Sequence, residues 1–189
     1  AVTDATSVTF DRTAPTATAV TIASDNAYTS KAKVGDEITV SFTVDDDLLL
    51  APTASIQTKS ATVAVDGAHP NYSAKYTLLA GDSAGAIAFT LDFTDESGNA
   101  ATQVSAVTDA SSVTFDKTAP TATSVTIVSD NATNTVAKTG DEITVSFTVD
   151  EALLATPTAT IQTKAATVAV DGAHPNYTAK YTLIGTDTE

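Results

Sequence analysis

Oxygen-bearing side chains gather at three separate places in the first half of the chain: Asp11, the run Asp45-Asp46-Asp47, and Asp95 with Asn99. Carboxylate, amide and carbonyl oxygens are the ligands that calcium takes, about six to eight of them at roughly 2.3–2.6 Å. Aspartates held together without a cation would repel one another. Calcium binding therefore requires a fold that brings three distant segments to one place.

The chain repeats itself at a spacing of 105 residues. The first joint reads Phe10-Asp11-Arg12-Thr13-Ala14-Pro15, and it returns as Phe115-Asp116-Lys117-Thr118-Ala119-Pro120. A period of this length has the size of a small domain. The repeat predicts three parts: residues 1–11 as the end strand of a preceding repeat, residues 12–116 as a first repeat, and residues 117–189 as a second repeat lacking its last two strands.

Alternating apolar residues predict strands along each repeat. The clearest case is residues 37–44, where Ile38, Val40, Phe42 and Val44 share one face. About seven such strands separated by turn signals, with no helical period, predict an all-β fold of antiparallel β-sandwiches with Greek-key connections. Residues 48–52 are interpreted as a loop or a single helical turn. A change of parity predicts a bulge or a break between Thr108 and Ser112.

In a seven-stranded sandwich, the loops after the second, fourth and sixth strands lie at the end where the chain enters. This arrangement places the acidic run, Asp95 and Asn99 around the joint that carries Asp11. The first loop of a repeat, which contains Asp25, lies at the opposite end and is expected to reach the joint with the repeat that follows. The predicted interdomain calcium ligands are Asp11, Asp25, Asp45, Asp46, Asp47, Asp95 and Asn99, with Asp116, Asp150 and Glu151 at the second joint. The alternative interpretation is that these acids are solvated turn residues and strand terminators.

Two motifs resemble a known family: the joint at residues 115–121 and the hairpin Asp95-Glu96-Ser97-Gly98-Asn99. They resemble the bacterial immunoglobulin-like (Big-type) tandem repeats of giant secreted and cell-surface adhesins, and the resemblance covers the whole chain. It implies tandem immunoglobulin-like sandwiches outside the bacterial cell, acting as a non-enzymatic extender in cell adhesion with calcium stiffening the joints. The chain lacks the cysteines and the tryptophan of antibody-type domains.

Composition and charge argue against several other classes. The chain has 9 basic and 23 acidic residues, a net charge of −14, which opposes binding to nucleic acid or to anionic lipid. No apolar run is long enough to span a membrane, and the absence of cysteine excludes disulfides and thiolate metal sites. No nucleophile elbow or phosphate-binding glycine loop is present, so we expect no enzymatic activity. His69 and His174, at equivalent repeat positions, are interpreted as turn residues.

Two other functions remain open. One is a self-assembling filament subunit, in which residues 2–11 of a neighbouring copy add a strand to the open edge of the second repeat. The other is a carbohydrate- or protein-binding module, which would need an exposed aromatic platform, whereas Phe42, Tyr72, Tyr76 and Phe89 are predicted to face inward. The expected partners are neighbouring repeats of the same chain and neighbouring copies, and the sequence indicates no target surface.

Overall fold

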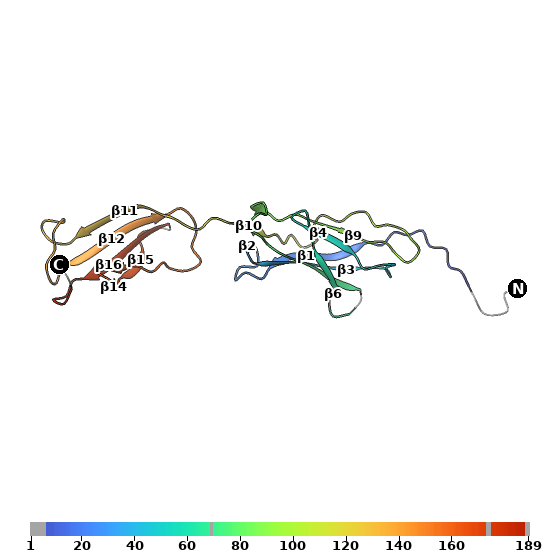
Figure 1. The fold of residues 1–189 in the computed structure, drawn as a ribbon, viewed down its shortest axis with the longest axis horizontal. Coiled ribbons are helices and arrows are strands. Elements are labelled where there is room, and N and C mark those ends of the chain that lie inside the picture. Colours follow the sequence, from blue (N-terminus) through green and yellow to red (C-terminus); the bar gives the residue numbers. More distant parts are fainter. Residues whose placement is uncertain (1–6, 69, 173–174, 188–189) are drawn as a thin grey trace. The chain divides into compact units, whose positions relative to one another are not determined.

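The computed structural model describes residues 7–68, 70–172 and 175–187, and these residues form an all-β protein without a helix (Figure 1). The chain divides into two compact units, unit 1 (Ala1–Lys117) and unit 2 (Thr118–Glu189). Unit 1 contains three sheets and the described part of unit 2 contains two, with largely antiparallel pairing. The predicted all-β class and antiparallel pairing are confirmed.

The largest sheet of unit 1 has the order β1-β3-β7-β6 and is antiparallel throughout. Its strands are β1 (Ala17–Ser24), β3 (Glu37–Val44), β7 (Asn71–Thr77) and β6 (Thr62–Val65). In β3, every second residue is buried, because one face of the strand covers the core and the other meets solvent. The strand predicted at residues 37–44 is therefore confirmed residue for residue.

Two smaller sheets complete unit 1. One has the order β5-β4-β9, from β5 (Lys59–Ser60), β4 (Thr53–Ile56) and β9 (Phe89–Asp92). The other has the order β2-β10-β8, from β2 (Lys31–Ala32), β10 (Thr114–Phe115) and β8 (Gly85–Ala86). Strand β10 is parallel to β2 and antiparallel to β8. The chain therefore places residues 114 and 115 beside a strand more than 80 positions earlier.

The core of unit 1 lies between these sheets. The Phe42 ring on β3 stacks on the ring of Tyr72 with centroids 5.6 Å apart, and on the ring of Phe93 with centroids 6.4 Å apart. Phe93 follows β9, so this stack joins the large sheet to the β5-β4-β9 sheet. Apolar side chains from both sheets are almost fully buried around it, including Ile38, Val40, Ile56 and Leu91. Two sheets that share one apolar core make unit 1 sandwich-like.

Residues 105–113 contain no strand in the part of the chain that the structure describes. Val104 still exchanges backbone hydrogen bonds with Leu91, whereas the Thr108 amide donates to the Val20 carbonyl at 2.8 Å. Ala110 has a φ of +62°. The chain thus leaves β9, crosses to β1 and then enters β10, so the predicted break between Thr108 and Ser112 is confirmed. Residues 48–52 form no helical turn: Leu48 makes an isolated bridge with Asp95.

Unit 2 forms its large sheet in the order β11-β12-β16-β15. The strands are β11 (Ala122–Ser129), β12 (Glu142–Val149), β16 (Asn176–Thr182) and β15 (Thr167–Val170), and β13 (Thr160–Ile161) pairs with β14 (Lys164–Ala165). Each pairing repeats one in unit 1 at an offset of 105 residues, with the same register. The same sequence pattern therefore produces the same ladder in both units.

Candidate metal centre

Three carboxylates of unit 1 meet at one place: one oxygen each from Asp11, Asp46 and Asp95 lies within 4.8 Å of the other two. Asp11 comes from the segment before β1, Asp46 from the turn after β3, and Asp95 from the hairpin after β9. Oxygens on a calcium coordination sphere with a radius of about 2.3–2.6 Å are at most about 5 Å apart. The spacing of the three oxygens therefore suits this cation.

Asp95 is the buried member of the group, with 1% of its surface exposed. Its Oδ1 accepts from the Asn99 amide at 2.7 Å, and its Oδ2 accepts from Asn99 Nδ2 at 2.8 Å. Gly98 provides the tight turn between them with a φ of +93°, a conformation that glycine adopts without strain. Asn99 thus serves as the residue that fixes Asp95.

Burial alone would raise the pKa of Asp95. Hydrogen bonds from Asn99 and from the amides of Gly98 and Ser97 outweigh that effect and hold the pKa below its ordinary value. Asp95 is therefore ionised at neutral pH in a site that contains two further carboxylates.

The turn that carries Asp46 is tied to the hairpin that carries Asp95. The Glu96 amide donates to the Asp47 carbonyl at 3.1 Å, and the Leu49 amide donates to the Thr94 carbonyl at 3.0 Å. Asp46 Oδ1 accepts from the Asp47 amide at 2.8 Å. These backbone contacts bring two loops far apart in the sequence to the same position.

Asp45 has a structural contact of its own. Its two carboxylate oxygens accept from the amide and from the hydroxyl of Thr16, both at 2.6 Å. These hydrogen bonds lower the pKa of Asp45. They also anchor the segment that leads into β1, and Asp11 lies in that segment, where its Oδ1 accepts from the Thr13 amide at 2.9 Å. Asp45 thus lies outside the cluster of three carboxylates and holds in place the segment that carries Asp11.

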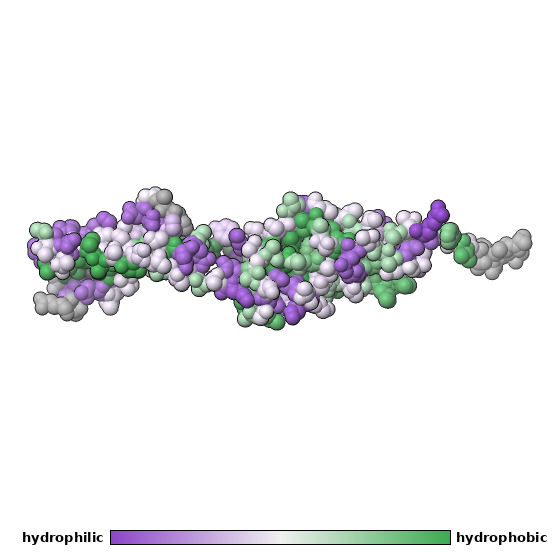
Figure 2. Space-filling model, turned by 90° about the horizontal axis from the view of Figure 1, so that it is seen from above, coloured by the Kyte–Doolittle hydropathy of each residue, from purple (hydrophilic) through white to green (hydrophobic). Residues whose placement is uncertain are grey.

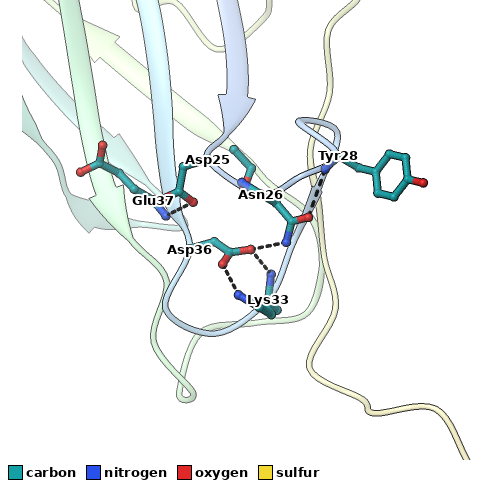
Figure 3. Close-up of polar contacts among 7 residues, drawn as sticks. Asp25, Asn26, Tyr28, Lys33, Asp36 and Glu37 are labelled. Atoms are coloured by element: carbon teal, nitrogen blue, oxygen red, sulfur yellow. Dashed lines mark hydrogen bonds and ion pairs between the residues drawn. The ribbon is translucent and has the colours of Figure 1, made fainter. Parts of the chain in front are cut away.

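Asp25 lies at the other end of the β1–β3 ladder, where Ser24 pairs with Ile38 (Figure 3). Its Oδ1 accepts from the Glu37 amide at 2.9 Å. Beside it, the Asp36 carboxylate accepts from Asn26 Nδ2 at 2.6 Å and from Lys33 Nζ at 2.6 Å. The Lys33 ammonium supplies a positive charge beside Asp36, and Lys75 Nζ donates to Glu37 at 2.7 Å at the same end of the unit. Within unit 1, Asp25 therefore does not meet Asp11. Its contact with the next repeat stays a prediction.

The three acids predicted at the second joint fall in both units. Asp116 belongs to unit 1 and donates its amide to the Ala32 carbonyl at 2.8 Å, whereas Asp150 and Glu151 belong to unit 2. Asp150 repeats the contact of Asp45, since its carboxylate accepts from the amide of Thr121 at 2.8 Å and also from its hydroxyl. The positions 105 residues beyond Asp95 and Asn99 lie outside the printed sequence.

Three buried carboxylates are not among the ligands predicted from the sequence: Asp36, its counterpart Asp141, and Asp82. Asp82 Oδ2 accepts from the Tyr76 hydroxyl at 2.9 Å and from the Leu79 amide at 2.8 Å. The recurring Lys-x-x-Asp spacing of Lys33 with Asp36 was the available signal for the first of them. The predicted turn residues His69 and His174 lie outside the described residues.

Among the described residues, no helix has the length and apolar character needed to cross a membrane. Comparison of the chain with models of known protein families, with curated proteins and with solved structures gives no match.

Proposed function

We propose that the chain is a non-enzymatic structural module, built of immunoglobulin-like sandwiches, that binds calcium through Asp11, Asp46 and Asp95. In this proposal it is part of the extracellular extender of a bacterial surface adhesin. The observation that carries the proposal is the convergence of three carboxylates from three segments, one of them buried.

Calcium accounts for this convergence better than solvation does. Negative charges at this distance repel one another, and the repulsion is strongest where a group is shielded from water. A divalent cation reverses the sign of that interaction, and backbone carbonyls and water complete its coordination. The segment that precedes β1 carries Asp11, so a bound ion would fasten the connection leading into the unit to the body of the unit.

A spacer also fits the repeated ladder. The β1–β3 and β11–β12 ladders have identical registers. This match supports the proposal, because an extender needs copies, whereas a recognition site does not. Strands of eight residues span about 26 Å at ~3.3 Å per residue. Each added unit would lengthen the extender by a distance of that order.

The experiment compares thermal unfolding of the full chain in calcium and in chelator. A ligand that binds only the folded state at about 100 times its Kd stabilises it by ~2.7 kcal/mol. For a unit of this size that corresponds to a rise in Tm of about 10 °C. We expect this rise for the unit 1 transition of the wild type.

The variant Asp46→Asn removes one charge and keeps the oxygen that accepts from the Asp47 amide. It should lose the calcium-dependent rise. The matched variant Asp25→Asn makes the same change at the other end of the ladder, keeps the acceptor for the Glu37 amide, and should retain the rise. A rise that survives in Asp46→Asn, or no rise in the wild type, would overturn the proposal.

A further inference from the structure

Unit 2 has a groove at a place that a segment of the chain covers in unit 1. There, Val113 and Phe115 are each only 1% exposed. The Thr114 amide donates to the Ser30 carbonyl at 3.0 Å, and the Asp116 amide donates to the Ala32 carbonyl at 2.8 Å. Residues 112–116 thus cover an edge of the unit 1 core by pairing in parallel with β2.

Unit 2 has the counterpart of β2 at Val136 and Ala137, but no strand pairs with these residues in the described part of the chain. Val136 is 56% exposed and Ala137 is also exposed, whereas the equivalent Ala32 is buried. A groove of about 650 Å³ opens beside them, with an apolar lining that includes Ala137, Ile143, Ile161 and Leu183. Figure 2 shows hydrophobic atoms at the surface of this unit.

The chain carries a second copy of the covering segment. Residues 7–11 have the same sequence as residues 112–116: serine, valine, threonine, phenylalanine and aspartate. In this copy the apolar side chains are uncovered, with Val8 100% and Phe10 85% exposed. One pentapeptide is therefore buried against unit 1 at one position and open to solvent at the other.

We propose that residues 7–11 of a second copy of this chain bind in the unit 2 groove as an added parallel strand. The register follows from β10 and β2, where Thr114 pairs with Lys31 and Phe115 with Ala32. Shifted by 105 residues, it places Thr9 of one copy opposite Val136 of the next, and Phe10 opposite Ala137. Strand addition satisfies an open edge through backbone hydrogen bonds and gains specificity from the buried side chains. The contact is head-to-tail, so it propagates from copy to copy.

The first test is the mass of the full chain in solution as a function of concentration, measured by sedimentation velocity. The wild type should form oligomers whose size grows with concentration. Phe10→Asp should stay monomeric throughout that range, and its folding should be intact because Phe10 is exposed. Leu50→Asp changes another exposed apolar residue, on unit 1, and should oligomerise like the wild type.

The second test uses the absence of native cysteine. A chain with Thr9→Cys is mixed with a chain with Val136→Cys under mild oxidation. Each chain then has a single cysteine, so a disulfide between positions 9 and 136 can form only between two chains. We expect a disulfide-linked heterodimer in high yield, and little when Val136→Cys is replaced by Val170→Cys, which is exposed on β15 of the same unit.

A wild type that remains monomeric at all concentrations would overturn the inference. Equal loss of oligomers in Leu50→Asp and Phe10→Asp would also overturn it, because association would then be nonspecific. Equal yields from the two cysteine pairs would show that the register is wrong. These outcomes are independent of the calcium test, which measures stability rather than mass.

Discussion

Strands β1 and β11 have almost the same sequence and the same partner register, yet they differ sharply in burial. Each pairs with its neighbour through six matched positions and carries the same register shift, at Thr18/Thr21 and at Thr123/Thr126. In β1, Val20 is 0% and Ile22 5% exposed. In β11, the corresponding Val125 is 60% and Ile127 65% exposed.

Pairing and burial therefore have separate origins. The ladder depends on the alternation within the strand and its immediate partner, which both units possess. Burial depends on segments from elsewhere: Thr108 donates to the Val20 carbonyl, and the Ile22 amide donates to Ser111 Oγ at 2.9 Å. Unit 1 has these covering segments, whereas the described part of unit 2 shows none over β11.

The largest expected effect comes from the aromatic ring that closes the core. Phe115→Ala should destabilise unit 1 by about 3–5 kcal/mol, because it empties a fully buried site. Phe10→Ala, the same change in the same pentapeptide, should alter stability by no more than about 0.5 kcal/mol. Urea unfolding at low protein concentration, with NMR signals of each unit followed separately, measures both. Similar losses would show that Phe10 is buried in solution.

A smaller contrast is expected for the paired isoleucines. Ile22→Ala should cost unit 1 about 2–5 kcal/mol, whereas Ile127→Ala should change unit 2 by about 0.5 kcal/mol, since little of its side chain is removed from water. The same urea experiment applies, in the Phe10→Asp background so that copies do not associate. If Ile127→Ala costs as much as Ile22→Ala, the contrast between the two strands is wrong.

The smallest effect on stability is expected from a buried aspartate that makes the same contacts in both units. Asp141 is buried and accepts from Asn131 Nδ2 at 2.8 Å and from Lys138 Nζ at 2.7 Å, which lowers its pKa to about 2. A lowered folded-state pKa contributes stability that is present above the unfolded value near 4 and is lost as pH falls through the folded value. Unit 2 should therefore lose stability between about pH 4 and pH 2.

Asp36 makes the same contacts in unit 1; burial would raise its pKa, but the hydrogen bonds from Asn26 and Lys33 hold it below its ordinary value. Urea midpoints measured from pH 5 to pH 2 should fall in both units. Asp141→Asn should make the fall in unit 2 less steep, and Asp36→Asn should do the same in unit 1, while the other carboxylates with a lowered pKa, such as Asp45, Asp95 and Asp150, still contribute. A flat wild-type curve would contradict the assignment.

Structural features that depend on neighbouring positions in the chain were predicted correctly from the sequence. The alternation at residues 37–44 predicted β3 and its buried face, and the parity change predicted the break near Ala110. The sequence could not predict that residues 114 and 115 lie parallel to β2, because that pairing joins segments more than 80 residues apart. Tyr76 is half-buried and donates to Asp82, a contact that period-two alternation does not predict.

The candidate site shows the same division. Residue types identified the acidic segments, and general sandwich topology placed them at one end. The sequence pattern does not predict which of these side chains converge, because that depends on individual hydrogen bonds. Asp45 is bonded to Thr16 and stays outside the cluster, whereas the backbone of the turn that carries Asp46 is bonded to the hairpin that carries Asp95. Three of the ten predicted ligands therefore form the cluster, and whether calcium binds there stays a prediction.

Isothermal titration of calcium into the full chain, after removal of bound metal with chelator, measures calcium binding at the cluster itself. The cluster of Asp11, Asp46 and Asp95 predicts one specific calcium ion per chain in the wild type and in Asp25→Asn, and none in Asp46→Asn. No binding by the wild type, or undiminished binding by Asp46→Asn, would contradict it.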